Sequence, residues 1–231
     1  LSAMSEHKII RLGHHGDGIA DGPLYAPMTL PGEIVTGTVN GTDLSDIRIV
    51  TPSSDRVAAP CSHYKSCGGC QLQHASDTFV AEWKADVVSH ALAAHGLDPE
   101  VRPTLTSPAQ SRQRATLTVK RTKNGAMVGF HSRASDTMIE VPNCQLIDPK
   151  IKEVFDTLRE LAMIGASRKA PLAATVTVSM DGMDVSVQGG KPLDGPLRGA
   201  LAQLCDSTGL VRLTWEDEVI AMRTPPRQAF G

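Results

Sequence analysis

Short apolar runs separated by turn residues fill the beginning of the chain. The runs lie at 8–12, 24–26, 33–39 and 47–51, with glycine and proline between them. Asn40-Gly41 follows one of these runs, and this dipeptide is a strong hairpin signal. Evenly spaced short strands of this kind are typical of a small barrel. The pattern therefore predicts a β-barrel over residues 1–58.

Residues 59–231 combine helical and strand-like periods. Helices are predicted at 77–95, from Asp148-Pro149 onward and at 195–205. Hairpins are predicted at 115–121 with 127–131 and at 174–180 with 183–188, followed by strands at 211–215 and 219–223. This part of the chain predicts an α+β domain. The apolar stripe of the first helix, which includes Phe79 and Trp83, requires a partner surface.

A glycine-rich stretch at residues 13–22 superficially fits a nucleotide-binding loop. Such a loop needs a helix directly after it, and Pro23, Pro27 and Pro31 prevent one from starting there. We therefore predict turns in this stretch, with His14 and His15 exposed to solvent.

Length and composition agree with an intracellular globular protein. The 231 residues suffice for one large domain or two smaller ones, and no apolar run is long enough to cross a bilayer. With no secretory leader, the cytoplasm is the expected location. Leu1-Ser2-Ala3, which precedes Met4, is expected to be an expression remnant.

Charge is unevenly distributed along the chain, although the net charge is only −2. Residues 1–58 carry four Lys or Arg against seven Asp or Glu, whereas residues 101–135 carry seven cations and no carboxylate. A local surplus of this kind predicts contact with a phosphate backbone, and its alternative is a solvated sheet face. Aromatic residues are scarce here, so base stacking is poorly supported. The candidate residues for contact with a nucleic acid are Arg112, Arg114, Lys120, Arg121 and Arg133.

Three cysteines within ten residues form the most specific motif. Cys61, Cys67 and Cys70 flank a Gly-Gly pair that lets the backbone curl, and Cys144 offers a distant fourth thiol. Four soft thiolates favour zinc or an iron–sulfur cluster, and the spacing alone does not choose between them. Buried free cysteines or a disulfide are the alternatives. Five cysteines, an odd number, suit a reducing compartment.

These pieces resemble one known family. Cys61, the run Cys67-Gly-Gly-Cys70, the following Gln71-Leu-Gln-His74 and Cys144 resemble the cluster motif of the S-adenosylmethionine-dependent RNA (uracil-5)-methyltransferases of 23S rRNA and tRNA. Residues 12–33 are similar to their TRAM domain, a small OB-like RNA-binding barrel. Gly129-Phe-His131 and the C-terminal run 225–231 are also similar to segments of that family.

The resemblance implies a [4Fe-4S] cluster on Cys61, Cys67, Cys70 and Cys144. In that family a cysteine thiolate adds to C6 of uracil, C5 takes the methyl group, and a carboxylate removes the C5 proton. We expect the C-terminal α/β methyltransferase domain, which binds S-adenosylmethionine, to be absent from this chain, so we assign no catalytic residue. The helix at 77–95 is assigned to the second domain, and the alternative is that it belongs to that absent domain. The expected partner is RNA, rRNA before tRNA, with no membrane and a monomeric chain.

Two other functions compete with this interpretation. The first is a stand-alone RNA-binding module with structural zinc, and the second is an iron–sulfur electron carrier, which lacks support because no flavin or nicotinamide motif is present. Cys205, the spare thiol, has no nearby base and is expected to be buried and structural. His63 and His74 are expected to be surface residues; the alternatives are that they hydrogen-bond to the metal ligands or serve as metal ligands themselves.

Overall fold

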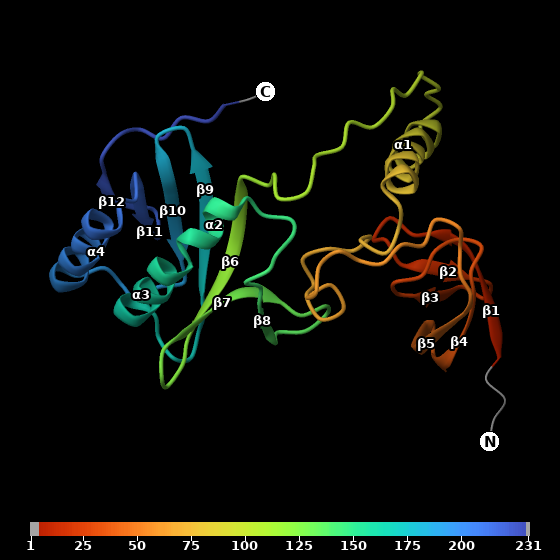
Figure 1. Cartoon of the computed structure of the whole chain (residues 1–231), viewed down its shortest axis with the longest axis horizontal. Helices are drawn as coiled ribbons and strands as arrows, with labels where there is room; N and C mark the ends of the chain where they lie inside the picture. The colour runs from red at the N-terminus through yellow and green to blue at the C-terminus, as the bar shows by residue number, and fades with distance from the viewer. Residues whose placement is uncertain (1–4, 230–231) are drawn as a thin grey trace. The chain divides into compact units, whose positions relative to one another are not determined.

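The computed structural model describes residues 5–229 and divides the chain into two compact units. Unit 1 runs to Pro60 and also includes Cys70–Thr106, whereas unit 2 consists of Cys61–Gly69 and the chain from Ser107 onward. Figure 1 shows the strands of unit 1 in red and orange and the sheet of unit 2 in green to blue. The expected expression remnant and the last two residues of the family-like C-terminal run lie outside the described residues.

Unit 1 contains the predicted β-barrel. Its strands close in the order β1-β2-β3-β5-β4, and all neighbours are antiparallel except β3 and β5. Side chains of Ile9, Val35 and Leu44 fill its interior. The strands are β1 (Glu6–Leu12), β2 (Gly18–Ala20), β3 (Leu24–Ala26), β4 (Ile34–Asn40) and β5 (Asp43–Thr51).

Strand β2 lies in the glycine-rich stretch for which the sequence predicted only turns. A Cβ on Gly18 would lie 2.0 Å from the Thr29 hydroxyl oxygen, so glycine permits the close approach of these two segments. His14 and His15 are exposed, as predicted. The glycines of this stretch therefore serve both turns and a strand.

A buried carboxylate connects the barrel to the segment that follows it. Glu33 is fully buried and accepts hydrogen bonds from the Leu30 N–H at 2.8 Å and the Ser53 N–H at 3.2 Å. The Arg56 guanidinium also donates to it, with Nη2 2.8 Å from Oε2. Burial raises the pKa of Glu33, but these hydrogen bonds outweigh it and hold the pKa below its usual value.

Helix α1 (Asp77–Ala93) belongs to unit 1, whereas the sequence placed it in the second domain or in the absent one. The Ser76 side chain caps its first turn by accepting from the Phe79 N–H at 3.2 Å. Phe79 and Trp83 pack against a small cluster that includes Leu12 and Leu30 of the barrel unit. The apolar stripe therefore finds its partner within unit 1.

Unit 2 is the predicted α+β domain, built on a seven-stranded sheet in the order β12-β11-β10-β9-β6-β7-β8. Only β10 and β11 are parallel, and α4 connects them. The strands are β6 (Arg114–Arg121), β7 (Ala126–His131), β8 (Met138–Glu140), β9 (Leu172–Ser179), β10 (Gly182–Gln188), β11 (Arg212–Trp215) and β12 (Glu218–Met222).

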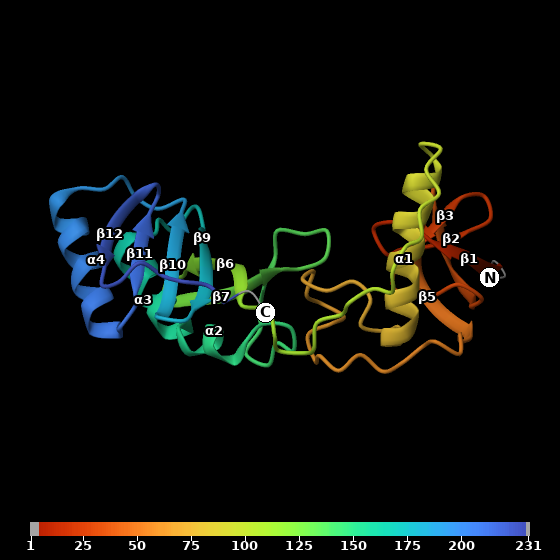
Figure 2. The same cartoon turned by 90° about the horizontal axis from the view of Figure 1, so that it is seen from above.

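Helices α2 (Pro149–Glu153), α3 (Phe155–Gly165) and α4 (Gly195–Thr208) pack against this sheet (Figure 2). The core between helices and sheet includes Leu158 and Leu161 from α3 and Leu117 and Val176 from the strands. The sequence predicted one helix from residue 148, but the helix breaks at Val154, whose φ of −92° and ψ of 5° are not helical. None of the described helices is both long enough and apolar enough to span a bilayer.

Candidate nucleic-acid interface and cysteine site

Strand β6 separates a buried face from an open face of the sheet. Ala115, Leu117 and Val119 are buried against the core, while Arg114 and Lys120 are exposed. Because successive strand residues point to opposite faces, the two cations lie on the open face. The open face is therefore the part of unit 2 on which predicted RNA-binding residues come together.

The other three predicted cations lie elsewhere. Arg112 is exposed just before β6, where its backbone pairs with Ile147. Arg121 points to the covered side, because Nη1 donates to the Ala166 carbonyl at 3.4 Å. Arg133 is half-buried, and its guanidinium carbon lies 5.9 Å from the centre of the Tyr64 ring. The structure thus brings Arg114 and Lys120 onto one face and separates Arg121 from them.

Sequence reasoning overlooked Met127 and Met138, which share the open face with Lys120. Met127 pairs directly with Lys120 across β6 and β7, and Met138 pairs with His131 across β7 and β8. Paired residues lie on the same face of a sheet. The position of Met127 opposite Lys120 therefore followed from the register of the predicted hairpin. The position of Met138 depends on the pairing of β8 with β7, which no turn signal in the sequence specifies.

The cysteine loop is fixed to β7 and to the residues after it by backbone hydrogen bonds. The Cys67 N–H donates to the His63 carbonyl at 2.8 Å, and the Gly68 N–H donates to the His131 carbonyl at 2.9 Å. A Cβ on Gly68 would lie 3.0 Å from that same carbonyl oxygen and 3.3 Å from the Arg133 Cα. Gly68 therefore allows this close approach, whereas a Cβ on Gly69 would meet its nearest atom, the Cys67 sulfur, only at 3.4 Å.

Three of the four predicted ligands belong to unit 2, and Cys70 begins the second segment of unit 1. None of the five cysteines, all of which lie within residues 5–229, forms a disulfide. Burial raises the pKa of Cys67, the Gly69 N–H lowers it, and the neighbouring Cys144 and Cys61 raise it further. The Cys61 and Cys144 thiols therefore lie near enough to Cys67 to interact with it electrostatically.

The donor chemistry of these cysteines suits a soft metal centre. The Gly69 N–H donates to the Cys67 sulfur at 3.4 Å, and the Leu146 N–H donates to the Cys144 sulfur at 3.5 Å. Amide donors to sulfur are a usual feature of iron–sulfur ligation. Within residues 5–229, however, no group of three or more His, Cys, Asp or Glu side chains is arranged to hold a metal ion.

The remaining candidates are Cys205, His74 and His63. Cys205 is fully buried, its sulfur lies 3.6 Å from the Leu210 carbonyl oxygen, and burial raises its pKa, as expected for a structural thiol. His74 is buried in unit 1, with Nε2 3.5 Å from the Thr29 carbonyl oxygen, so the expectation of a surface residue was wrong. His63 is half-buried in the cysteine loop.

The combination of a small closed barrel and an α+β sheet in one chain also occurs in a solved structure. It is similar to the crystal structure of the Pyrococcus abyssi tRNA (uracil-54, C5)-methyltransferase in complex with S-adenosyl-L-homocysteine, with a TM-score of 0.63. The likeness covers 93% of this chain and 51% of that one, at 21% sequence identity. At this identity the likeness establishes the fold.

Proteins that are similar to this chain in sequence are named as RNA methyltransferases. The chain is 32% identical over 223 residues to an uncharacterized RNA methyltransferase of Brucella suis biovar 1, and this match covers 95% of the chain and 54% of the relative. It is 34% identical over 231 residues to one of Rhizobium meliloti, covering 96% of the chain and 56% of the relative. A 23S rRNA (uracil(1939)-C(5))-methyltransferase of Halomonas elongata is 33% identical over 161 residues, which is 64% of this chain and 33% of that protein.

The chain is homologous to RNA methyltransferases, some of which methylate uracil C5 in ribosomal RNA. Nearly the whole chain matches the Brucella and Rhizobium relatives, but it spans only about half of their length. No protein-family model matches the chain.

Proposed function

We propose that this chain is the RNA-recognition portion of an S-adenosylmethionine-dependent RNA methyltransferase that methylates uracil C5, with ribosomal RNA as the substrate. The observation that carries the proposal is the match over nearly the whole chain to proteins named as RNA methyltransferases. Methyl transfer, and the binding of the methyl donor, would belong to parts of the protein beyond this chain.

The open face of the sheet in unit 2 supports RNA contact. Arg114 and Lys120 are exposed there, and neither has an ion-pair partner among the residues that the structure describes. Thr116 adds a hydroxyl to the same face, 2.8 Å from the Thr175 hydroxyl of β9. Unpaired cations with hydroxyls between them suit phosphate and ribose oxygens, which dominate affinity for RNA.

The proposal includes a [4Fe-4S] cluster held by Cys61, Cys67, Cys70 and Cys144. Two of these sulfurs already accept amide hydrogen bonds. Transfer of a methyl group to uracil requires no electron transfer, so the cluster would serve to organise the fold of the RNA-recognition portion. The cysteine loop is hydrogen-bonded to His131, the last residue of β7, so an ordered loop would also fix this end of the basic hairpin, which consists of β6 and β7.

Salt-dependent RNA binding tests this function. The full chain is titrated into a fluorescently labelled, folded rRNA fragment that displays an unpaired uridine loop, over a range of KCl concentrations. Replacing Arg114 and Lys120 together with alanine should weaken binding and reduce the slope of log K against log[KCl] by about two, one for each lost phosphate contact.

A matched double variant provides the control. Arg168 and Lys169 are exposed in the loop between α3 and β9, and their replacement with alanine removes the same charge from another site. The control should leave the slope unchanged. An equal fall in slope for both double variants would mean that only total charge matters and would remove the open face from the interface. Absence of any RNA binding by the full chain would contradict the proposed function.

A further inference from the structure

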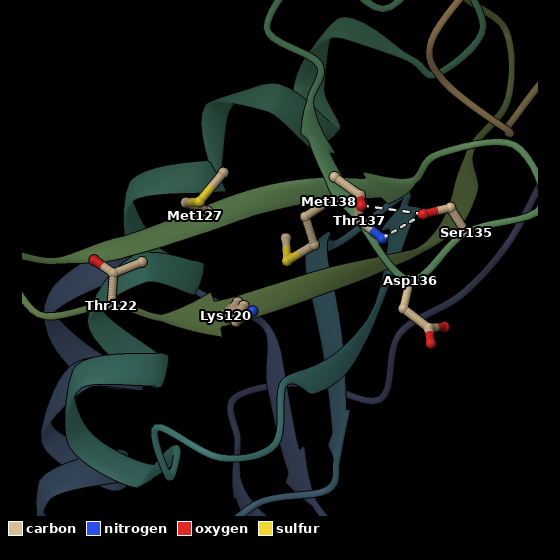
Figure 3. A pocket seen from close by; sticks show the side chains of 7 residues that line it. All are labelled: Lys120, Thr122, Met127, Ser135, Asp136, Thr137 and Met138. Carbon is tan, nitrogen blue, oxygen red and sulfur yellow. Dashed lines mark hydrogen bonds between the residues drawn. The ribbon is translucent and has the colours of Figure 1, made fainter.

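A hollow on the open face of unit 2 lies between the basic hairpin and the loop that joins β7 to β8 (Figure 3). Its volume is about 670 Å³. Sites for small ligands commonly enclose roughly 300–1,000 Å³. The lining residues come from β6, β7, β8 and the adjoining loops, and they are Lys120, Thr122, Met127, Ser135, Asp136, Thr137 and Met138.

Two methionines form the apolar part of the hollow. Met127 and Met138 are half-buried and come from the neighbouring strands β7 and β8 (Figure 3). Gly129 follows two residues after Met127 on the same face of β7, beside strand β8. A Cβ on Gly129 would lie 1.9 Å from the Ile139 carbonyl oxygen, so this position must remain glycine. Thioether sulfur makes favourable contacts with flat aromatic rings.

A polar rim, formed by Ser135, Asp136 and Thr137, borders one side of the hollow. The Ser135 hydroxyl donates to the Thr137 hydroxyl at 3.0 Å and accepts from the Thr137 N–H at 3.1 Å, as the dashed lines in Figure 3 show. The Ser132 N–H donates to the Thr137 carbonyl at 2.7 Å and closes the loop. These bonds orient the Ser135 and Thr137 hydroxyls relative to each other.

Charge is divided between the two sides of the hollow. Lys120 and Thr122 lie on the hairpin side, and Asp136 lies on the rim. Asp136, like Lys120, has no ion-pair partner among the residues that the structure describes. A phosphate would be repelled by the carboxylate and attracted by the ammonium group, so it fits the hairpin side. A carboxylate at the opposite side accepts hydrogen bonds from an amino group.

We propose that this hollow binds one unstacked nucleotide of the RNA whose base carries an exocyclic amine. The base lies against Met127 and Met138, Lys120 contacts the phosphate, and Asp136 accepts a hydrogen bond from the amine. This inference rests on the proposed RNA-recognition function and adds base selectivity to it. Adenine, cytosine and guanine carry such an amine, whereas uracil offers only a carbonyl there.

The direct test is NMR of the full chain labelled with ¹³C at the methionine methyl groups, titrated with AMP, CMP and UMP. The chain has eight methionines. The methyl signals of Met127 and Met138 should shift on binding. Exposed Met163 on α3 and Met222 on β12 lie outside the hollow and should not shift. AMP and CMP should bind at least about fivefold more tightly than UMP, the selectivity of one good amine contact.

Two variants separate the phosphate contact from the base contact. Lys120→Gln should weaken all three nucleotides by the same factor and reduce the salt dependence of binding. Asp136→Ala should abolish the preference for AMP and CMP over UMP. If Asp136→Ala instead tightens all three nucleotides equally, the carboxylate only repels phosphate and the proposed base contact is wrong.

A short single-stranded RNA distinguishes failure of this inference from failure of the proposed function. RNA that binds the full chain without moving the Met127 and Met138 signals would refute the nucleotide site and leave RNA recognition intact. Mononucleotides that shift these signals, while folded and single-stranded RNA show no affinity, would retain the site and contradict the proposed function.

Discussion

At the scale of single residues, Glu33 is the buried charge on which unit 1 depends. Its carboxylate collects donors from the Leu30 and Ser53 backbone and from the Arg56 side chain, which anchors the segment after the barrel. A buried carboxylate is tolerated only when its acceptor sites are satisfied. Glu33 is one of the seven acidic residues within residues 1–58. Because its charge is buried and paired with Arg56, it contributes little to the electrostatic field that an RNA would meet.

Replacing Glu33 with glutamine should lower the free energy of unfolding by about 2 kcal/mol at pH 7, because the charge-assisted hydrogen bonds to Arg56 become neutral ones. Denaturant unfolding followed by circular dichroism measures this loss. Glu82→Gln, which changes an exposed carboxylate on α1, is the control and should change stability little. An equal loss in the two variants would show that the buried pair has no special role.

The same pair gives a defined pH dependence. The folded pKa of Glu33 lies below its unfolded value, so its stabilisation is fully present above the unfolded pKa and disappears as pH falls through the folded pKa. The unfolded value for glutamate is about 4.3. The stability difference between the wild type and Glu33→Gln should therefore be constant near neutral pH and shrink at pH 3. A difference that grows on acidification would contradict the assignment.

At the scale of elements, packing decides what the same substitution does in two helices. Gly165 ends α3, and a Cβ there would lie 2.3 Å from the Trp215 ring, which is fully buried. Gly199 lies within α4 and is exposed, and a Cβ there would meet nothing within 4 Å. A side chain at position 165 would therefore clash with the core, whereas one at position 199 would change only the helix propensity.

Gly165→Ala should lower the free energy of unfolding by about 1–3 kcal/mol through overpacking against Trp215. Gly199→Ala should raise it by roughly 0.5–1 kcal/mol, because alanine favours the helix and glycine does not. Thermal unfolding of both variants checks the pair. Stabilisation by Gly165→Ala would show that Trp215 moves aside freely, which a closely packed core does not allow.

Most elements were predictable where the local signal and the tertiary environment agree. Helix α1 and the hairpin of β6 and β7 lie where the sequence placed them. Strand β2 was missed because its identity comes from pairing with β1 and β3 rather than from its own alternation. The break at Val154 was missed because both flanking segments keep helical periodicity, with Ile151 before it and Phe155 after it both buried.

At the scale of the whole molecule, the candidate site was only partly predictable. The surplus of positive charge was visible in the sequence, but strand alternation sends Arg121 toward Ala166 and Lys120 to the open face. The cysteine motif was visible as a pattern of spacing, whereas the bonding of Gly68 to the end of β7 depends on tertiary structure. The grouping of α1 with the barrel likewise depends on the apolar surface that Leu12 and Leu30 provide.

Cys67→Ser should remove iron and reduce the stability of the protein together, because metal binding by such sites is coupled to folding. Iron analysis and thermal unfolding of the anaerobically purified variant measure both effects. Cys205→Ser is the matched control, since Cys205 is also buried but lies in the core beside Leu210. The control should retain its iron. A Cys67→Ser protein that is well folded, free of iron and normal in RNA binding would contradict an organising role for the cluster.

The metal content of the anaerobically purified chain tests the central claim most directly, because it separates a uracil-5 methyltransferase cluster from a zinc-stabilised RNA-binding module. Iron and acid-labile sulfide are determined together with the visible spectrum. The account predicts about four irons and four sulfides per chain, with the broad absorbance of an iron–sulfur cluster. One zinc per chain without sulfide would contradict it and would assign the four cysteines to a structural zinc site.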